Sequence, residues 1–268
     1  MNHSLIYDIR TSENALSTLV NFTGVVPPIW EKYIQLRSNY RYDEDLVEDV
    51  ISKHGHFPTN YETWMFVYFH ITTSANKCQS FKTHGIFDLK KSYLCPDSEL
   101  RQFLDDKGVV IDIDAHSLNY RGQAYDISYG KYPSGFDTKA HACWSIGRKF
   151  YYDYTTCGFL SVWDSSPYGG YVHCRPEILS DIDNLLGLTL SQEWHLTHKP
   201  YEIVAIIQGS DIVYDGDDNQ SSKDKILNYL TKAYSTAFGS PFEEIVLLKN
   251  NIQVPPHRII EINPLSYW

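Results

Sequence analysis

The sequence predicts a mixed α+β fold, in which a helical N-terminal section precedes a strand-rich remainder. In residues 1–58 apolar side chains recur at helical spacing, whereas strand-like segments begin after His56-Phe-Pro58 and alternate with helices. With 268 residues, 43% of them hydrophobic, the chain is long enough to bury a substantial core without disulfides or metal ions. We therefore expect a helical section at residues 1–58 and a larger domain at residues 59–268.

Three helices are predicted in the N-terminal section. The first begins with Ser12 as its cap, the second follows Pro27-Pro28, and the third ends near Gly55. Their apolar faces consist of Ala15, Leu16, Leu19 and Val20 in the first, Ile29, Trp30, Tyr33 and Ile34 in the second, and Leu46, Val47, Val50 and Ile51 in the third.

Strands dominate the remainder of the chain. The segments with strand character are Trp64 to Ile71, Val109 to Ile113, Cys143 to Tyr154, Gly158 to Trp163, Glu202 to Gln208, Glu244 to Leu248 and Arg258 to Ile262. Helices are expected between them at Ser74 to His84, Asp97 to Lys107, Pro176 to Leu186 and Ser221 to Phe238. In the last helix Ser221 is followed three residues later by Asp224, a capping-box pattern.

Composition excludes several classes of protein. A formal charge of -10 argues against a broad basic face for non-specific nucleic-acid or membrane binding. It is still compatible with a local basic groove. The 5 cysteines form no CxxC pair, so neither a disulfide framework nor a metal site is expected. The first residues lack the apolar core of a signal peptide, and the apolar runs are too short to span a membrane. These features predict a cytoplasmic protein without a membrane partner.

One motif joins a strand to a short helix. The segment Tyr68-Phe-His-Ile-Thr-Thr-Ser74 ends a strand with His70 and Thr72, and the expected helix leads on to Gly85-Ile86. Backbone amides at the start of a helix favour anions. A strand-end histidine beside such amides suits the binding of a dinucleotide, although a structural histidine is the common alternative.

Two further motifs follow in the same order along the chain. The segment Gly158-Phe-Leu-Ser-Val-Trp-Asp-Ser-Ser-Pro-Tyr-Gly-Gly-Tyr171 is a glycine-led strand, a turn of small residues and a following tyrosine. The segment Pro241-Phe-Glu-Glu-Ile-Val-Leu-Leu-Lys-Asn250 sets a glutamate directly before an apolar strand. A fixed carboxylate there is able to stabilise an oxocarbenium-like ribose, as glycosidase carboxylates do.

Together the three motifs resemble the ADP-ribosyltransferase fold, in particular its histidine-containing branch of DarT-like and diphtheria-toxin-like enzymes. The resemblance spans about residues 64 to 262 and implies a split β core with flanking helices, with 59–268 as the catalytic domain. It implies NAD as co-substrate and Glu244 as the catalytic residue, with Glu243 as the alternative. The NAD-binding residues that it implies are His70, Ile71, Thr72, Phe159 and Tyr171, with Tyr168 as an alternative to Tyr171 for stacking on nicotinamide.

The resemblance also implies a class of acceptor. Phe242 stands two residues before Glu244, where many enzymes that modify arginine or guanine have Glu or Gln, and this argues against an arginine target. Similarity to DarT-like enzymes favours a nucleic-acid base over a protein as acceptor of ADP-ribose. An intracellular enzyme of this type resembles the toxin of a bacterial toxin-antitoxin or phage-defence system, with an antitoxin protein as partner.

Two other hypotheses remain. His141-Ala-Cys143 is compatible with a hydrolase in which the Cys143 thiolate is the nucleophile and His173 or His195 the base, although a cysteine among aromatic residues is usually inert. The chain is also compatible with a catalytically inactive binding protein that has a degenerate NAD fold. Loss of activity with a thiol reagent, or affinity without NAD turnover, would distinguish these two hypotheses.

Overall fold

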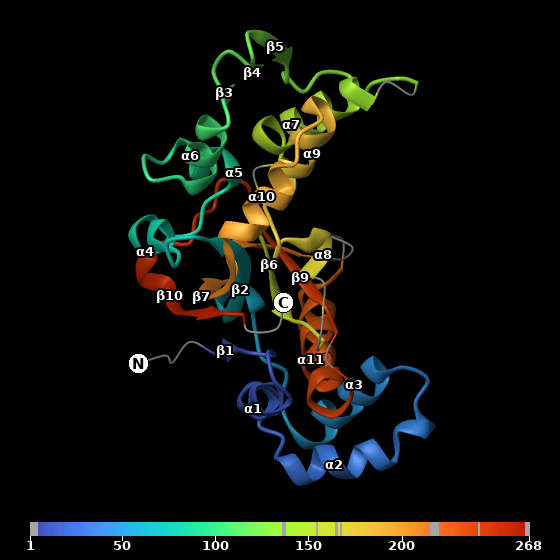
Figure 1. The fold of residues 1–268 in the computed structure, drawn as a ribbon. Coiled ribbons are helices and arrows are strands. Elements are labelled where there is room, and N and C mark those ends of the chain that lie inside the picture. Colours follow the sequence, from blue (N-terminus) through green and yellow to red (C-terminus); the bar gives the residue numbers. More distant parts are fainter. Residues whose placement is uncertain are drawn as a thin grey trace. The chain divides into compact units, whose positions relative to one another are not determined.

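The chain folds into two units that each combine segments far apart in the sequence (Figure 1). The computed structural model describes residues 5–135, 138–153, 155–163, 166, 168–214, 220–240 and 242–265. Unit 1 consists of residues 1–69, 157–166 and 204–248, and unit 2 consists of residues 70–156, 167–203 and 249–268. The predicted domain boundary at residue 58 does not coincide with this division, because the chain first passes from one unit to the other after Phe69.

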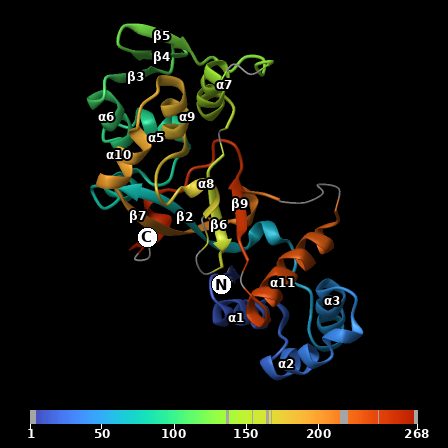
Figure 2. The same ribbon diagram turned by 45° about the vertical axis from the view of Figure 1, so that its right-hand side comes forward.

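Unit 1 contains a group of helices built from both ends of the chain. They are α1 (Ser12–Thr23), α2 (Pro27–Gln35), α3 (Asp43–His54) and α11 (Ser222–Phe238). Helix α11 packs against α1 and α3, and α2 packs against α3 (Figure 2). The predicted N-terminal helices are confirmed, and they belong to the same unit as a helix from residues 222–238.

Side chains cap the N-termini of α1 and α11. The Ser221 hydroxyl accepts from the Asp224 amide, and the Asp224 carboxylate accepts from the Ser221 amide, which confirms the predicted capping box. The cap of α1 is Thr11 rather than Ser12. The Ser12 hydroxyl instead donates to the Thr236 carbonyl of α11 over 3.0 Å, so it joins two helices.

The strands of unit 1 are ordered β7-β2-β6-β9-β8, with the short β1 parallel to β2. Strands β6 and β9 are antiparallel, as are β2 and β6, and β8 and β9. Residues 70–74 of β2 and residues 199–203 of β7 belong to unit 2. The bounds are β1 (Ile6–Tyr7), β2 (Met65–Ser74), β6 (Cys157–Ser161), β7 (Lys199–Gln208), β8 (Ile212–Val213) and β9 (Glu244–Leu248).

Aromatic side chains fill the core of unit 1. Tyr7, Phe66 and Tyr229 contact one another, with ring centroids 4.9 Å apart for Tyr7 and Phe66 and 5.1 Å for Phe66 and Tyr229. Phe22 meets Trp64 edge to face at 4.5 Å. The Tyr7 hydroxyl donates to the Tyr229 carbonyl over 2.8 Å, so its polar end is satisfied inside the core. These aromatic side chains therefore serve packing.

Unit 2 is built from short helices around a second hydrophobic cluster. The helices are α4 (Gln79–His84), α5 (Leu89–Leu94), α6 (Glu99–Asp106), α7 (Thr138–Tyr151), α8 (Tyr168–Tyr171), α9 (Glu177–Leu186) and α10 (Leu190–Thr197). Helix α7 packs against α9. The cluster includes Leu104, Val109, Leu118, Ile146, Phe150, Leu179, Ile182 and Trp194.

Two β elements complete unit 2. Strands β3 (Val109–Asp112), β4 (Ser117–Tyr120) and β5 (Gln123–Asp126) form an antiparallel three-stranded sheet. Strand β10 (Ile259–Pro264) lies beside the first half of β7.

Short 3-10 helices occur at Arg37–Asn39, Tyr61–Thr63 and Gly209–Asp211 in unit 1 and at Pro256–Arg258 in unit 2.

The strand predicted at Cys143 to Tyr154 is wrong, because residues 143–151 belong to helix α7 and Tyr154 lies outside the described residues. Aromatic residues raise its strand propensity, but Ala142, Ile146 and Phe150 are buried at the four-residue spacing of a helix. Gly147 fits where a Cβ would come within 2.2 Å of the Ile127 carbonyl oxygen. Tertiary packing therefore decides the conformation here.

The coarse fold class is confirmed, since the chain is mixed α+β with antiparallel sheets. The predicted strands at 64–71, 109–113, 158–163, 202–208, 244–248 and 258–262 correspond to β2, β3, β6, β7, β9 and β10, with ends that differ by up to three residues. Within the described part of the chain, no helix combines the length and apolar character needed to cross a membrane.

Candidate active site

Strand β9 begins at the glutamate that the sequence singled out. Glu244 is paired with Ser161 of β6, next to an irregularity in register between Phe159 and Ser161. The Ser161 side chain is fully buried, and its hydroxyl donates to the Phe242 carbonyl over 2.8 Å. The backbone immediately before Glu244 is therefore fixed to the neighbouring strand.

The carboxylate of Glu244 lies in a mostly buried position. Glu244 is 8% exposed, and its carboxylate forms an ion pair with the Lys232 ammonium of α11. Lys232 also lies 5.9 Å from the centre of the Tyr229 ring. Burial raises the pKa of Tyr7 well above its usual value, and the nearby charge of Glu244 raises it further. The opposite charge of Lys232 offsets part of the cost of burying the Glu244 carboxylate.

Glu243 has different surroundings from Glu244. Its side chain is half-buried, and the buried Ser166 hydroxyl donates to its carboxylate. Among the described residues, the Glu243 carboxylate forms no ion pair, whereas Glu244 is paired with Lys232. The two alternatives for a catalytic glutamate are thus distinguished by burial and by the charge of their partners.

The glycine that leads β6 is required by close packing. A Cβ at Gly158 would come within 2.1 Å of the Tyr68 ring and 2.6 Å of the Phe69 carbonyl oxygen. The Tyr68 hydroxyl donates to the Cys157 carbonyl over 3.0 Å. Phe69 is paired with Phe159, and their rings stack with centroids 5.6 Å apart. Phe159 is therefore a packed residue between strands, buried to 4% exposure.

His70, Ile71 and Thr72 lie in the part of β2 that belongs to unit 2. His70 is half-buried, and its ring centre is 6.1 Å from that of Phe81 in α4. Ile71 is buried, whereas Thr72 is half-buried. The next residue, Thr73, accepts a hydrogen bond from the Trp194 indole over 2.8 Å, which anchors this end of the strand.

The helix expected from Ser74 begins only at Gln79, and the amides expected to be free for an anion are occupied. The carboxylate of Glu99 accepts from the Ala75 amide at 2.9 Å and from the Asn76 amide at 3.2 Å. The Ser74 hydroxyl donates to the same carboxylate over 2.9 Å. The Glu99 carboxylate therefore binds the backbone amides that we expected to bind an anionic dinucleotide.

The two tyrosines considered for nicotinamide stacking both lie in α8. Tyr171 is 60% exposed and Tyr168 is half-buried. Their ring centres are 6.0 and 5.8 Å from that of His173, which is 3% exposed. Burial raises the pKa of Tyr168, and the charge of Glu202 adds to this. Residues 164, 165 and 167 of the turn before α8 lie outside the described residues.

The expected NAD-binding residues are divided between the units. Phe159 and Glu244 belong to unit 1, where strands β6 and β9 pair. His70, Ile71, Thr72 and Tyr171 belong to unit 2. The candidate glutamates have partners that the sequence does not indicate, namely Lys232, Ser161 and Ser166. No spacing connects these residues to Glu243 or Glu244, because the contacts arise between separate elements.

The competing nucleophile lies in a helix. Cys143 is half-buried in α7 and packs against the hydrophobic cluster of unit 2, as expected for an inert thiol. His198 has a packing role, since its ring stacks on Trp194 with centroids 3.4 Å apart. Burial lowers the pKa of His198, while a hydrogen bond to the Trp194 carbonyl and the charge of Glu99 oppose this shift.

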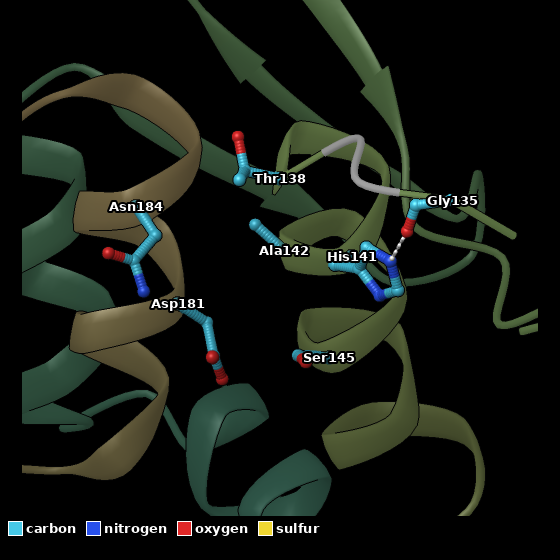
Figure 3. A pocket seen from close by; sticks show the side chains of 7 residues that line it. All are labelled: Gly135, Thr138, His141, Ala142, Ser145, Asp181 and Asn184. Atoms are coloured by element: carbon cyan, nitrogen blue, oxygen red, sulfur yellow. Dashed lines mark hydrogen bonds between the residues drawn. The ribbon is translucent and has the colours of Figure 1, made fainter. Parts of the chain in front are cut away.

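Unit 2 also contains an open pocket of about 740 Å³ between α7 and α9 (Figure 3). Its lining is Gly135, Thr138, His141, Ala142, Ser145, Asp181 and Asn184. His141 is hydrogen-bonded to the Gly135 carbonyl at 3.1 Å. Burial raises the pKa of Asp181, which Lys149 partly opposes. The pocket does not include any of the residues expected to bind NAD.

No protein-family model, no curated protein and no solved structure matches this chain.

Proposed function

We propose that the chain is an NAD-dependent ADP-ribosyltransferase whose reaction depends on Glu244. The observation that carries this proposal is the mostly buried Glu244 carboxylate at the start of β9, held beside β6 and paired with Lys232. An ionised carboxylate on a rigid strand is the group that this chemistry requires. The three motifs that resemble the histidine-containing branch of the family support the same assignment.

In the proposed reaction, the bond between the nicotinamide nitrogen and C1′ of the adjoining ribose breaks. Nicotinamide leaves with the bonding electrons, and the ribose acquires oxocarbenium character. The Glu244 carboxylate accepts a hydrogen bond from the ribose hydroxyl and stabilises the positive charge. A nucleophilic atom of the acceptor then bonds to C1′ and gives up its proton to solvent. ADP-ribosylated acceptor and free nicotinamide are the products.

Lys232 adds a condition to this scheme. Its ammonium pairs with the Glu244 carboxylate, so it competes with the ribose hydroxyl for the same oxygen atoms. Binding of NAD therefore has to shift or share this ion pair. Glu243 has a serine partner in place of the lysine and serves as the matched control for the choice of glutamate.

We further propose a nucleic-acid base as acceptor, with a protein as the alternative, and a toxin role with an antitoxin partner. Resemblance to DarT-like enzymes supports the base, and Phe242 in place of Glu or Gln argues against arginine. The formal charge of -10 requires any basic groove for nucleic acid to be local.

The test is transfer of label from NAD, labelled in its ADP-ribose part, to macromolecules of a cell lysate. We expect the natural chain and Glu243→Gln to label acceptors and release nicotinamide, and Glu244→Gln to do so at least about 100-fold more slowly. Nuclease sensitivity of the label would identify nucleic acid as the acceptor, and protease sensitivity would identify protein. Circular dichroism of each variant controls for folding.

Full activity of Glu244→Gln would overturn the assignment of this residue. Absence of label and of nicotinamide release from the natural chain would leave the hydrolase and the inactive binding protein. Treatment with a thiol reagent then separates those two hypotheses, because only the Cys143 hydrolase loses activity.

A further inference from the structure

Three potential metal ligands converge where α4 and the α5–α6 connection meet. His84, Cys95 and Asp97 each offer one ligand atom, and these atoms all lie within 4.8 Å of one another. The His84 Nε2 and Asp97 Oδ1 atoms are 3.0 Å apart. All three side chains are partly exposed, so an ion has access from solvent. His84 and Cys95 are 11 residues apart in the sequence, and Cys95 and Asp97 are 2 residues apart. This spacing does not by itself predict a metal site.

The backbone on either side holds this group in place. His84 ends α4, and Ile86 forms two backbone hydrogen bonds with Val254, at 2.9 and 3.1 Å. Gly85 between them has φ +89, and a Cβ there would come within 2.0 Å of the Val254 carbonyl oxygen. The end of α4 is therefore fixed by a close approach that only glycine permits.

A tight turn supplies the other two ligands. The Ser98 amide donates to the Cys95 carbonyl over 3.1 Å, which closes the turn Cys95-Pro-Asp-Ser98. Proline at the second position favours this turn, and the Ser98 hydroxyl caps α6 by accepting from the Arg101 amide. Cys95 and Asp97 are thus held at fixed positions of one turn, facing the end of α4.

We propose that His84, Cys95 and Asp97 bind one zinc ion, with water or another molecule as the fourth ligand. Sulfur, nitrogen and oxygen donors together suit this ion, and sites with three protein ligands keep a fourth position open. In a tetrahedral zinc site the ligand atoms lie about 3.3–3.6 Å apart. Ligand atoms within 4.8 Å of one another reach that geometry by changes of at most about 1.5 Å in their separations. A thiolate and a carboxylate balance the two positive charges of the ion.

The site is independent of the proposed transferase chemistry, but it lies on the helix that contacts His70. Phe81 of α4 lies against the His70 ring, and His84 is three residues further along the same helix. A bound ion tethers the end of this six-residue helix to the turn before α6. Because zinc binds the folded site and not the separated ligands, it stabilises this part of unit 2.

The test uses the reduced, chelator-treated full chain. Zinc affinity is measured by competition with a chelating indicator, and Co²⁺ serves as a spectroscopic probe of the ligands. We expect one site per chain and a thiolate-to-cobalt charge-transfer absorption. Cys95→Ser abolishes that absorption, and His84→Ala weakens zinc binding at least about 100-fold. Asp97→Asn, which keeps the side-chain shape, weakens it as well.

Cys157→Ser is the matched control, since Cys157 is an exposed cysteine of unit 1, and it retains the zinc affinity of the natural chain. Circular dichroism of the metal-free variants separates loss of a ligand from loss of folding. A Co²⁺ spectrum without the thiolate absorption, or zinc affinity that is unchanged in Cys95→Ser and Asp97→Asn, would overturn the proposal. NAD turnover is not a readout, so failure here leaves the proposed function untouched.

Discussion

At the scale of single residues, the candidate glutamate is defined by its partner. Glu244 is nearly buried, and Lys232 compensates its charge from a helix that begins 22 residues earlier in the chain. Glu243, its neighbour, has a serine partner instead. Adjacent residues of one type thus acquire different environments, because alternate positions at the start of a strand point to opposite sides.

This ion pair leads to a prediction about stability. Glu244→Gln leaves the Lys232 ammonium without its carboxylate, so we expect the free energy of unfolding to fall by about 1–3 kcal/mol. Lys232→Met added to Glu244→Gln recovers part of that loss, because the unpaired charge is removed. Urea unfolding of the natural chain, both single variants and the double variant measures the coupling. Additive effects would contradict a direct interaction.

His198 leads to a prediction about pH. Its pKa is lowered in the folded chain, chiefly by burial, from the usual value of 6.5. As the pH falls below about 6.5, the unfolded chain therefore takes up this proton first, and the folded state loses stability. We expect the natural chain to lose stability relative to His198→Gln between about pH 7.5 and 5.5. Urea unfolding across this range checks the sign, and a relative gain would contradict it.

At the scale of elements, β6 shows how one glycine sets the distance between strands. Its first two residues, Cys157 and Gly158, lie against the Tyr68 side chain, and the Phe159 ring stacks on Phe69. Because β6 also pairs with β9, its position determines where Glu244 lies. The glycine that the family resemblance emphasised is therefore needed for packing in this chain.

Replacing this glycine tests that packing. Gly158→Ala forces a Cβ into the Tyr68 ring and the Phe69 carbonyl, so we expect a loss of about 1–3 kcal/mol or more in the free energy of unfolding. Gly130→Ala is the control, since no atom lies within 4 Å of a Cβ built there. Urea unfolding compares the two. Equal stability of both variants would show that β6 is able to move away from β2 at no cost.

The elements also show where sequence patterns were sufficient. Helix α11 follows its cap and apolar face closely, and β9 has the predicted bounds. The strand prediction failed for residues 143–151 because aromatic residues suit both strands and helices, and only packing against α9 separates the two. The helix expected from Ser74 is shortened because the Glu99 carboxylate binds the Ala75 amide, and the Asn76 side chain accepts from the Gln79 amide at the start of α4.

At the scale of the whole molecule, the N-terminal section is part of a larger unit. Helices α1 and α3 bury apolar side chains in the unit to which α11 belongs, and Tyr7 reaches the Tyr229 carbonyl. The prediction of a separate helical section at 1–58 was based only on the position of these helices in the sequence. In the folded chain these helices cover α11, so they contribute to the core of unit 1.

A truncated chain tests this role. We expect residues 59–268 alone to lack a cooperative unfolding transition and to bind a hydrophobic dye, because the faces of α11 that contact α1 and α3 become exposed. Near-ultraviolet circular dichroism and thermal unfolding, compared with the full chain, provide the measurement. A cooperative transition with native tertiary signal would instead make the N-terminal section a separable appendage.

The sequence alone determined the mixed α+β class, the capping box of α11 and most strands, since these depend on local spacing and on side chains that bond to nearby backbone. It also identified Glu244, because a glutamate directly before an apolar strand is a local pattern. Only the tertiary structure decided that Lys232 pairs with Glu244, that Glu99 binds the amides after β2, and that His84 meets Cys95 and Asp97. These contacts join elements that are brought together by packing, and packing free energy depends on the whole chain rather than on any short segment of it.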